Sequence, residues 1–353
     1  MSLVHPIIRL KGTARERGLQ YGQAAKDKIW HSLQTYKTLF AGHAHMSWEQ
    51  AVQAARAFEA AFLEYLPQAK EEMQGIAEGA GLRYEDILTL NCRSELMFAR
   101  PDGCSTIAVL PQSSGNDHTY LAQTWDWIMP SRASTVILDI EQAPLPRILM
   151  VAEAGMIGGK GLNECGIGVA LNALSVGHGQ IGVPLHAMYR GILNSTLITD
   201  AMDRVTQCKR AGAGNFMIAS AQGLAFSVEY TPEDFDVLST LGEPLCHTNH
   251  YLSPLLRAED TLKAAVTDTF VRLNRLQIRS QEKVGQLNVG TIMEIFSDHA
   301  NCPDSLCSHE DPKDPQAARF CTVYAVAMDL TDRTLWVTNG YPCEGPAYPV
   351  TFK

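Results

Sequence analysis

The feature that most constrains the fold is a change of residue pattern at Cys104. Before it, Ala-, Glu-, Lys- and Gln-rich segments follow capping boxes at 13–16 and 47–50, which is typical of helices. After it, apolar and polar residues alternate, which is typical of strands. Gly18 and Gly22 lie one helical turn apart, which indicates a close-packing face. The predicted helices are 13–40, 48–65, 66–80 and 84–98.

The second part of the chain is predicted to be rich in short strands joined by tight turns. Helical blocks at about 185–208 and 262–298 interrupt them. Helices layered on mostly antiparallel sheets define an α+β class, and no linker-like segment divides the chain, so we expect one domain over 1–353. The predicted strands are 105–110, 119–125, 135–140, 148–152, 166–174, 215–220, 224–229, 321–329 and 334–338.

Composition excludes several classes of function. The chain has 353 residues, 46% hydrophobic content and a formal charge of -9, which suits an enzyme-sized globular protein and disfavours nucleic acid or an anionic membrane as partner. No apolar run approaches the length of a membrane span and no export signal opens the chain, so we expect a cytoplasmic protein. Its last residues, PVTFK, are not a peroxisomal address.

Nine cysteines without a small-domain framework are expected to be mostly reduced core residues. Cys104 differs, because it follows Asp102-Gly103 at the point where the strands begin. Glycine permits a strained peptide, and the thiol could attack that peptide in an N-to-S acyl shift, after which water would leave Cys104 as a new amino terminus. Its amine, with a pKa of about 7.7–8.0, could then accept the proton of the thiol. The alternative is a turn followed by a buried cysteine.

Two further residues are candidates for this chemistry. Asp126 lies between Trp125 and Trp127, where a buried carboxylate needs partners such as an ammonium group; an ordinary capping role is the alternative. Asn249, in Cys246-His247-Thr248-Asn249-His250, could offer an amide N–H to an oxyanion, although a turn asparagine is common.

A cluster of histidine and cysteine lies near the end of the chain. His299, Cys302, Cys307 and His309 could hold zinc, but their spacing is not a standard one. We therefore predict no metal and interpret the segment as a structured loop near the active site.

Taken in order, these segments resemble the isopenicillin N acyltransferase (acyl-coenzyme A:6-aminopenicillanate acyltransferase) family, a branch of the amino-terminal nucleophile (Ntn) hydrolases. The resemblance covers nearly the whole chain. The segments that carry it are Arg17-Gly18-x-x-Tyr21-Gly22, Asn91-Cys92-Arg93-Ser94-Glu95, Asp102-Gly103-Cys104-Ser105-Thr106, Gln123-Thr124-Trp125-Asp126, Glu153-Ala154-Gly155-Met156-Ile157-Gly158, Gly161-Leu162-Asn163, Asn172-Ala173-Leu174, His247-Thr248-Asn249-His250 and Ser305-Leu306-Cys307.

The resemblance implies a four-layer αββα fold and self-cleavage between Gly103 and Cys104. The products would be a helical segment, 1–103, and a second chain, 104–353, held together as a heterodimer. Cys104 would be the nucleophile, Asp126 would orient its amine and Asn249 would form the oxyanion hole. Supporting or substrate-binding roles would fall to Thr106, Asn172, Ser308 and His309.

One departure from the family concerns the residue after Ser305-Leu306-Cys307. The family commonly has arginine there, whereas this chain has Ser308 and then His309, which puts recognition of acyl-coenzyme A or of a carboxylate in doubt.

The predicted function is a cysteine Ntn amidohydrolase or acyltransferase that acts on a small N-acyl substrate through a Cys104 thioester. It needs no cofactor, and acyl-coenzyme A is a candidate co-substrate; neither nucleic acid nor a membrane is an expected partner. The alternatives are a metal-assisted hydrolase that uses His299, Cys302, Cys307 and His309, and a ligand-binding relative that never cleaves itself.

Overall fold

The computed structural model describes residues 5–97, 103–257, 259–314 and 319–353. The chain forms two compact units. The first contains 1–101, 133–163 and 177–212, and the second contains 102–132, 164–176 and 213–353. Each unit combines helices with strands that are mostly antiparallel, which confirms the α+β class.

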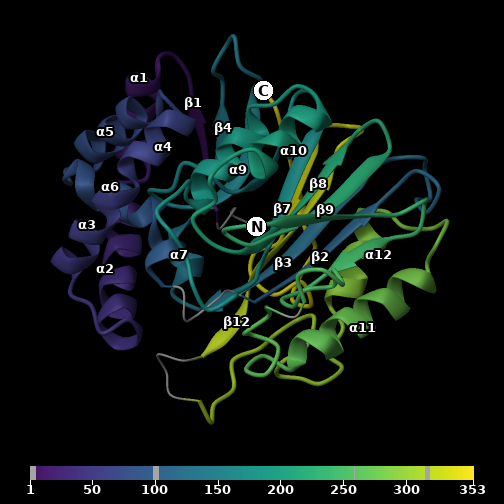
Figure 1. Cartoon of the computed structure of the whole chain (residues 1–353). Helices are drawn as coiled ribbons and strands as arrows, with labels where there is room; N and C mark the ends of the chain where they lie inside the picture. Colours follow the sequence, from purple (N-terminus) through teal and green to yellow (C-terminus); the bar gives the residue numbers. More distant parts are fainter. Residues whose placement is uncertain (1–4, 98–102, 258, 315–318) are drawn as a thin grey trace. The chain divides into compact units, whose positions relative to one another are not determined.

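Helices dominate the first unit and gather together in Figure 1. Thr13 and Ser47 cap the first and third of these helices with the capping boxes expected from the sequence. The predicted helix over 13–40 is divided at Ala25, whose backbone leaves the helical region. The helices are α1 (Ala14–Ala24), α2 (Lys26–His43), α3 (Trp48–Ala55), the 3₁₀ helix η1 (Arg56–Phe58), α4 (Glu59–Tyr65), α5 (Ala69–Ala80), α6 (Tyr84–Asn91), α7 (Arg93–Leu96), α9 (Leu185–Leu193) and α10 (Ile198–Thr206).

Four strands complete the first unit: β1 (Ile7–Leu10), β4 (Thr135–Ile140), β5 (Ile148–Glu153) and β6 (Lys160–Asn163), adjacent in that order. The β1–β4 pair is parallel and the next two pairs are antiparallel. Both β4 and β5 are buried along their whole length, which explains their continuous apolar runs.

Glycine sets the closest helix packing of the first unit. A Cβ at Gly18 of α1 would lie 2.0 Å from the Glu72 carbonyl oxygen of α5, and one at Gly22 would lie 2.3 Å from that of Ile76. Gly75 and Gly79 approach α1 in the same way from the other side. The prediction that Gly18 and Gly22 form a close-packing face is therefore confirmed.

The second unit contains two groups of paired strands. The first group runs β7 (Ile167–Ala173), β8 (Gly214–Ser220), β9 (Leu224–Tyr230), β10 (Phe235–Ser239), with every pair antiparallel. The second is a six-stranded antiparallel sheet with the order β11 (Leu245–His247), β2 (Gly103–Val109), β3 (Tyr120–Ile128), β12 (Phe320–Asp329), β13 (Thr334–Val337), β14 (Tyr348–Thr351). A short helix, α8 (Ser131–Ser134), follows β3.

These two groups of strands pack face to face, since β2 and β3 contact β7 and β8. Helices α11 (Asp268–Gln281) and α12 (Val289–Phe296) contact the six-stranded sheet (Figure 1). Apolar side chains of both helices form a core with those of the sheet, among them Leu276 and Phe296 against Ile107 and Ala325. The second unit thus contains two sheet layers and a helix layer.

All nine predicted strands are confirmed, with ends within three residues, whereas five short strands were missed. The missed strands are β1, β6, β10, β11 and β14, which have three to five residues each and are too short to show a clear alternation. Among the described residues, no helix has both the length and the apolar character that crossing a membrane requires.

Candidate active site

The proposed cleavage point begins strand β2. Gly103 is the first residue of β2 and lies opposite Asp126 of β3, and Cys104 lies opposite Trp125. A Cβ at Gly103 would stand 3.0 Å from the Cβ and 3.3 Å from the Oδ2 atom of Asp126. The absence of a side chain at Gly103 therefore lets the Asp126 carboxylate lie close to the peptide before Cys104.

The backbone of Cys104 is held on both sides by polar side chains. Its N–H donates to Oδ1 of Asn249 at 2.9 Å. Its carbonyl oxygen accepts from Nη1 of Arg272 at 2.8 Å and from Nδ2 of Asn172 at 3.3 Å. The structure therefore brings together Cys104, Asn172 and Asn249, and adds Arg272, which was not identified from the sequence.

Arg272 is a buried cation on α11 that joins several of these groups. Besides Cys104, it donates to the Asn249 Oδ1 atom at 3.0 Å and to the Ser105 hydroxyl at 3.2 Å. Asp268, one helical turn earlier, accepts from its Nε at 2.8 Å. Two donors thus converge on Asn249 Oδ1, while Asn249 Nδ2 donates to the Ala173 carbonyl at 3.1 Å. This pattern fixes the orientation of the Asn249 amide.

Asp126 has a hydroxyl partner on the neighbouring strand. The Thr322 hydroxyl, on β12, donates to Asp126 Oδ1 at 2.7 Å and accepts from the Ser308 N–H at 2.9 Å. The Thr322 N–H in turn donates to the Ser308 carbonyl at 2.9 Å. Ser308 therefore acts on Asp126 through Thr322, by its backbone.

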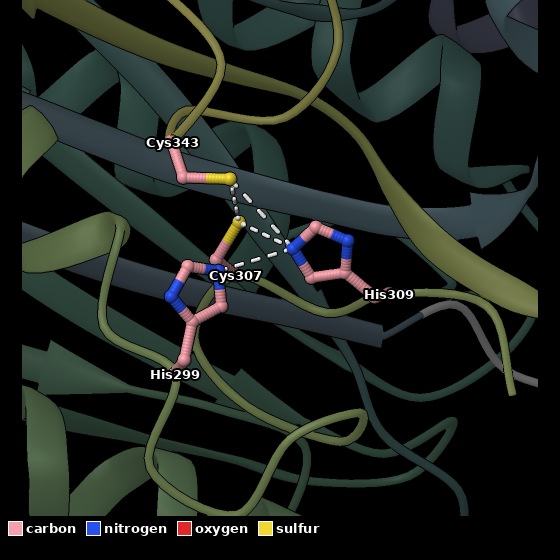
Figure 2. Close-up of side chains that lie close together, drawn as sticks. All are labelled: His299, Cys307, His309 and Cys343. Atoms are coloured by element: carbon pink, nitrogen blue, oxygen red, sulfur yellow. Dashed lines mark hydrogen bonds between the residues drawn. The ribbon is translucent and has the colours of Figure 1, made fainter.

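The residues on either side of Ser308 belong to a different cluster (Figure 2). Nitrogen and sulfur atoms of His299, Cys307, His309 and Cys343 all lie within 4.8 Å of one another. Cys302 is exposed and is not a member of this group. The candidate ligand set His299, Cys302, Cys307 and His309 is therefore wrong in one member, because Cys343 approaches from the segment after β13.

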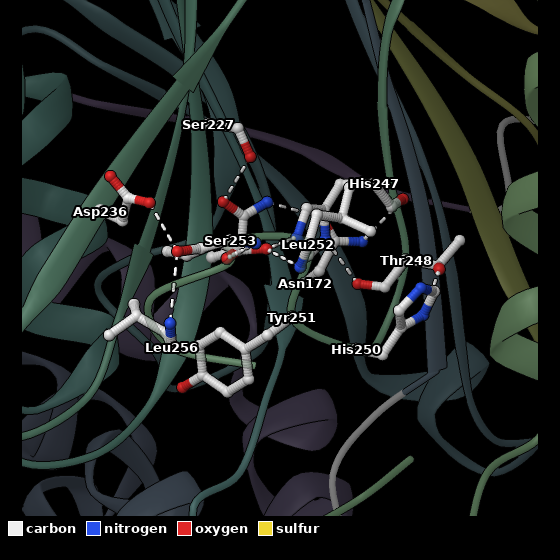
Figure 3. Close-up of polar contacts among 12 residues, drawn as sticks. Asn172, Ser227, Asp236, His247, Thr248, His250, Tyr251, Leu252, Ser253 and Leu256 are labelled. Atoms are coloured by element: carbon white, nitrogen blue, oxygen red, sulfur yellow. Dashed lines mark hydrogen bonds and ion pairs between the residues drawn. The ribbon is translucent and has the colours of Figure 1, made fainter. Parts of the chain in front are cut away.

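Asn172 is held by a chain of amides and hydroxyls. Its Oδ1 accepts from Asn215 Nδ2 at 3.2 Å, and Asn215 Oδ1 accepts from the Ser227 hydroxyl at 2.7 Å. Asn172 Nδ2 also lies 3.4 Å from the His247 carbonyl (Figure 3). Because β7, β8 and β9 each supply one residue, the sheet fixes the Asn172 amide that faces Cys104.

A buried acid–base pair anchors the segment that carries Asn249. Glu229 Oε1 lies 2.6 Å from His247 Nε2, and both side chains are fully buried. The Glu229 carboxylate also accepts from the N–H groups of Leu252 and Ser253, while His247 Nδ1 donates to the Thr248 carbonyl at 2.7 Å. These bonds fix the backbone on both sides of Asn249.

His250 is a neutral neighbour of the site. Burial, reinforced by the nearby His247, lowers the pKa of His250 to about 4. Its Nδ1 lies 2.9 Å from the Thr269 hydroxyl, and its ring packs 4.4 Å from that of Phe270. His250 therefore carries no charge at neutral pH.

The remaining predicted site residues lie in defined places. Thr106 is buried on β2 opposite Gln123 and His247, with its hydroxyl unbonded among the described residues. His309 belongs to the cluster with Cys343. Asp102, the first residue of the predicted cleavage motif, lies outside the described residues. Of the residues missed, Arg272 and Thr322 lie far from Cys104 in the sequence, in segments with no motif. His247 belongs to the motif His247-Thr248-Asn249-His250, but the sequence alone did not indicate that it pairs with Glu229.

Comparison with known proteins gives a consistent result. The sequence profile of the family described as acyl-coenzyme A:6-aminopenicillanic acid acyl-transferase matches residues 113–344. The acyl-coenzyme A:6-aminopenicillanic-acid-acyltransferase 40 kDa form of Emericella nidulans is 27% identical over 343 residues, which cover 95% of this chain and 92% of that protein.

Solved structures also match at low identity. A variant of the conjugated bile acid hydrolase from Clostridium perfringens is 10% identical, with a TM-score of 0.49 over 71% of this chain and 97% of that one. Penicillin V acylase from Agrobacterium tumefaciens is 13% identical, with a TM-score of 0.48 over 70% and 86% of the two chains.

The matched sequence defines an enzyme of the acyltransferase class. Within that class, the chain belongs to the acyl-coenzyme A:6-aminopenicillanic acid acyl-transferase family. The family resemblance seen in the sequence is thereby confirmed. The profile match includes Asp126, Asn172 and Asn249 and begins after Cys104, so it does not include the predicted cleavage point.

Proposed function

We propose that this protein is a self-processing cysteine amidohydrolase or acyltransferase whose nucleophile is Cys104. It cuts its own chain before Cys104 and then cleaves, or transfers, the acyl group of a small N-acyl amide. Membership of an acyl-transferring family supports the reaction class. The contacts made by the Cys104 backbone support the choice of nucleophile.

In self-cleavage, the peptide bond between Gly103 and Cys104 is first replaced by a thioester. The Cys104 sulfur attacks the Gly103 carbonyl carbon and forms a thioester, the C–N bond breaks, and the thiol proton passes to the Cys104 nitrogen. Water then hydrolyses the thioester and leaves a carboxylate on Gly103, a thiol on Cys104 and a free α-amine. The products are fragments of 103 and 250 residues, which remain together as a heterodimer.

Turnover uses the new amino terminus as the base. The amine takes the thiol proton while the sulfur attacks the acyl carbonyl, and it returns that proton to the departing amine of the substrate. Water, or a second amine, then resolves the acyl-enzyme. Asp126 orients the terminal amine and Asn249 belongs to the oxyanion site. No cofactor takes part, and acyl-coenzyme A is a candidate acyl donor.

One observation carries this proposal: the nitrogen atom of Cys104 already has a fixed acceptor, Asn249 Oδ1, at 2.9 Å. After cleavage the same atom would be the amine that acts as base, so the acceptor would hold it in place beside the thiol. Arg272, at the Cys104 carbonyl, adds a buried positive charge that favours a thiolate or an oxyanion.

Four protein ligands around one centre disfavour the metal-hydrolase alternative. A catalytic zinc keeps a position open for water, whereas His299, Cys307, His309 and Cys343 would together fill all four positions around a tetrahedral ion.

The test is intact-mass analysis of the wild type beside Cys104→Ala, with turnover of N-acyl amino acids, acylated amines and β-lactams measured on both. We expect the wild type to yield two fragments and to hydrolyse one substrate class, and Cys104→Ala to stay whole and inactive. Cys165→Ala, at an exposed cysteine, is the matched control and should behave as the wild type. An active wild type that stays intact, or a Cys104→Ala variant that still cleaves itself, would contradict the proposal.

A further inference from the structure

The four side chains in Figure 2 come from two connections, the one between α12 and β12 and the one after β13. His299 follows α12, Cys307 and His309 precede β12, and Cys343 follows β13. Figure 2 shows their nitrogen and sulfur atoms turned toward a common point. Cysteine and histidine side chains that converge from two connections are typical of a metal site, since each could have pointed to solvent instead.

Four of the six distances between these atoms lie within about 0.2 Å of those in a tetrahedral zinc site. Zn–S bonds of about 2.3 Å and Zn–N bonds of about 2.0–2.1 Å place two sulfurs about 3.8 Å apart, sulfur and nitrogen about 3.6 Å apart and two nitrogens about 3.3 Å apart. The structure has 3.6 Å between Cys307 Sγ and Cys343 Sγ. Nε2 of His309 lies 3.5 and 3.7 Å from these sulfurs and 3.1 Å from His299 Nε2.

We propose that His299, Cys307, His309 and Cys343 bind one zinc ion as a structural Cys2His2 site. This proposal replaces our prediction from the sequence that the chain binds no metal. Two thiolates with two imidazoles select zinc over hard cations such as Mg²⁺ or Ca²⁺, which prefer oxygen ligands. Since the protein supplies all four ligands, the ion has no open position for substrate and serves to hold the fold.

The surroundings orient these ligands. The ring of Tyr341 stacks on His309 with centroids 4.1 Å apart, and the Arg132 guanidinium lies 3.9 Å from the Tyr341 centroid. The Cys307 N–H donates to the Asp298 carbonyl at 3.1 Å, and Asp298 is paired with Arg275. Such outer contacts are those that fix the ligands of known metal sites.

A disulfide is the competing use of the two cysteines. Their sulfurs lie 3.6 Å apart, well beyond the 2.03–2.05 Å of a disulfide bond, and Nε2 of His309 lies 3.5 and 3.7 Å from them. A metal explains all four ligands, whereas a disulfide explains only two.

The site would also steady the acyl-transfer centre. Ser308 lies between two of the ligands, and its N–H donates to Thr322, which donates to Asp126. The zinc proposal itself does not depend on the proposed reaction, because it stands on the ligand geometry alone.

The first test is the zinc content of the full-length protein, purified without chelators and measured by elemental mass spectrometry. We expect about one zinc per chain, which should fall at least tenfold in Cys343→Ser and in His309→Ala. Cys302→Ser, which changes an exposed cysteine in the same loop, is the matched control and should keep its zinc. X-ray absorption of the wild type should show two sulfur and two nitrogen ligands.

The second test uses only the wild type and so does not depend on whether a variant folds. After chelation, Co²⁺ should restore one equivalent of bound metal, with the visible and thiolate charge-transfer bands of tetrahedral S2N2 coordination. The proposal is overturned if the wild type neither contains zinc nor takes up Co²⁺, if Cys343→Ser retains zinc while Cys302→Ser loses it, or if mass spectrometry finds a Cys307–Cys343 disulfide in the active protein.

Discussion

At the residue scale, Arg272 is the side chain that joins most of the candidate site. Arg272→Lys keeps the charge but loses the planar fork that reaches the Cys104 carbonyl and Asn249 Oδ1 at once. We expect self-cleavage to slow about 100-fold, because Arg272 holds the Cys104 backbone and the Asn249 amide in place and a small displacement of reacting groups can cost that much. The measurement is the first-order loss of the full-length band on a denaturing gel.

Arg279→Lys is the control for this change. Arg279 lies on the same helix, α11, and pairs with Glu282 at the surface, so its replacement should leave the rate of cleavage unchanged. If Arg272→Lys and the wild type cleave themselves at equal rates, the Arg272 guanidinium is not needed for self-cleavage.

A second prediction concerns the Thr322 hydroxyl. Thr322→Val keeps the shape of the side chain but deprives Asp126 of one partner and leaves the buried Ser308 N–H without its acceptor. We expect the free energy of unfolding to fall by about 1–3 kcal/mol. Urea denaturation measures it, and Thr322→Ser, which restores a hydroxyl, should recover most of the loss. If Thr322→Val and Thr322→Ser are equally stable, the hydroxyl does not hold Asp126.

The residues that could be predicted from the sequence are those that stand in short motifs. Cys104 follows a turn-forming glycine, and Asn249 lies in a run of polar residues, so local pattern alone drew attention to both. Arg272 looks like any helical arginine until α11 packs beside β2. Cys343 likewise lies near Cys307 only because the β12–β13 hairpin brings the end of the chain back beside it. Cys302, which is closer to Cys307 in the sequence, is exposed to solvent.

At the scale of elements, the contact between α1 and α5 depends on glycine. Gly18→Ala would place a methyl group 2.0 Å from the Glu72 carbonyl oxygen, so the two helices must separate. We expect a loss of about 1–3 kcal/mol in the free energy of unfolding, as for other overpacked cores. Urea denaturation at fixed pH measures this loss.

Gly42→Ala is the control for that experiment, because it should raise the free energy of unfolding instead of lowering it. Gly42 is the penultimate residue of α2 and has no atom within 4 Å of its Cβ position, so alanine there should stabilise the helix by up to about 0.5–1 kcal/mol. A Gly18→Ala variant as stable as Gly42→Ala would show that the close approach of α1 and α5 is not needed.

Glu95, on α7, is a buried carboxyl group whose contact with the start of α9 should make stability depend on pH. Its carboxylate accepts from the Leu185 N–H, at the start of α9, at 2.7 Å, and burial raises the pKa of Glu95 to about 7. Because the pKa of Glu95 in the folded protein exceeds its ordinary value of 4.5, folding takes up a proton between these two pH values. The contribution of protonated Glu95 to the stability of the folded state is therefore complete below pH 4.5 and is lost as pH rises through about 7. Glu95→Gln keeps an acceptor but cannot ionise.

The expected result is a change of about 2.5 kcal/mol, between pH 5 and pH 8, in the difference of unfolding free energy between wild type and Glu95→Gln. Urea denaturation at each pH measures it, and the subtraction cancels other titrating groups. A difference that stays constant over this range would mean that Glu95 is already ionised in the folded protein at pH 5.

Long elements were predictable because burial repeats along them. Strands β3 and β4 are buried throughout and β12 is buried after Phe320, and all three show in the sequence as largely apolar runs between turn residues. By contrast, β11 has three residues, and its place beside β2 depends on the pairing of His247 with Thr106, which no local pattern encodes. Pairing partners far apart in the chain are the part of the fold that sequence periodicity leaves undetermined.

At the scale of the whole molecule, the proposed cut divides the chain at a different place from the division into compact units. The first unit combines residues 1–101 with 133–163 and 177–212, which would fall on opposite sides of the cut. Within that unit, β1 pairs with β4 along four residues. Buried ion pairs also cross between the two future fragments: Glu72 with Arg190, and Arg93 with Glu153.

These contacts predict that cleavage does not release the fragments. Separating them would strip a strand from β4 and leave the buried charges of Arg190 and Glu153 without their partners, which costs about 3–5 kcal/mol for each broken pair. The cleaved protein should therefore elute from a native sizing column as one species with both fragments in equal amounts, and should separate only in denaturant. Arg190→Ala should weaken the association, whereas Arg279→Ala, which removes ion pairs that lie wholly within 104–353, should not. A 250-residue fragment that elutes alone under native conditions would show that the first unit does not hold the two chains together.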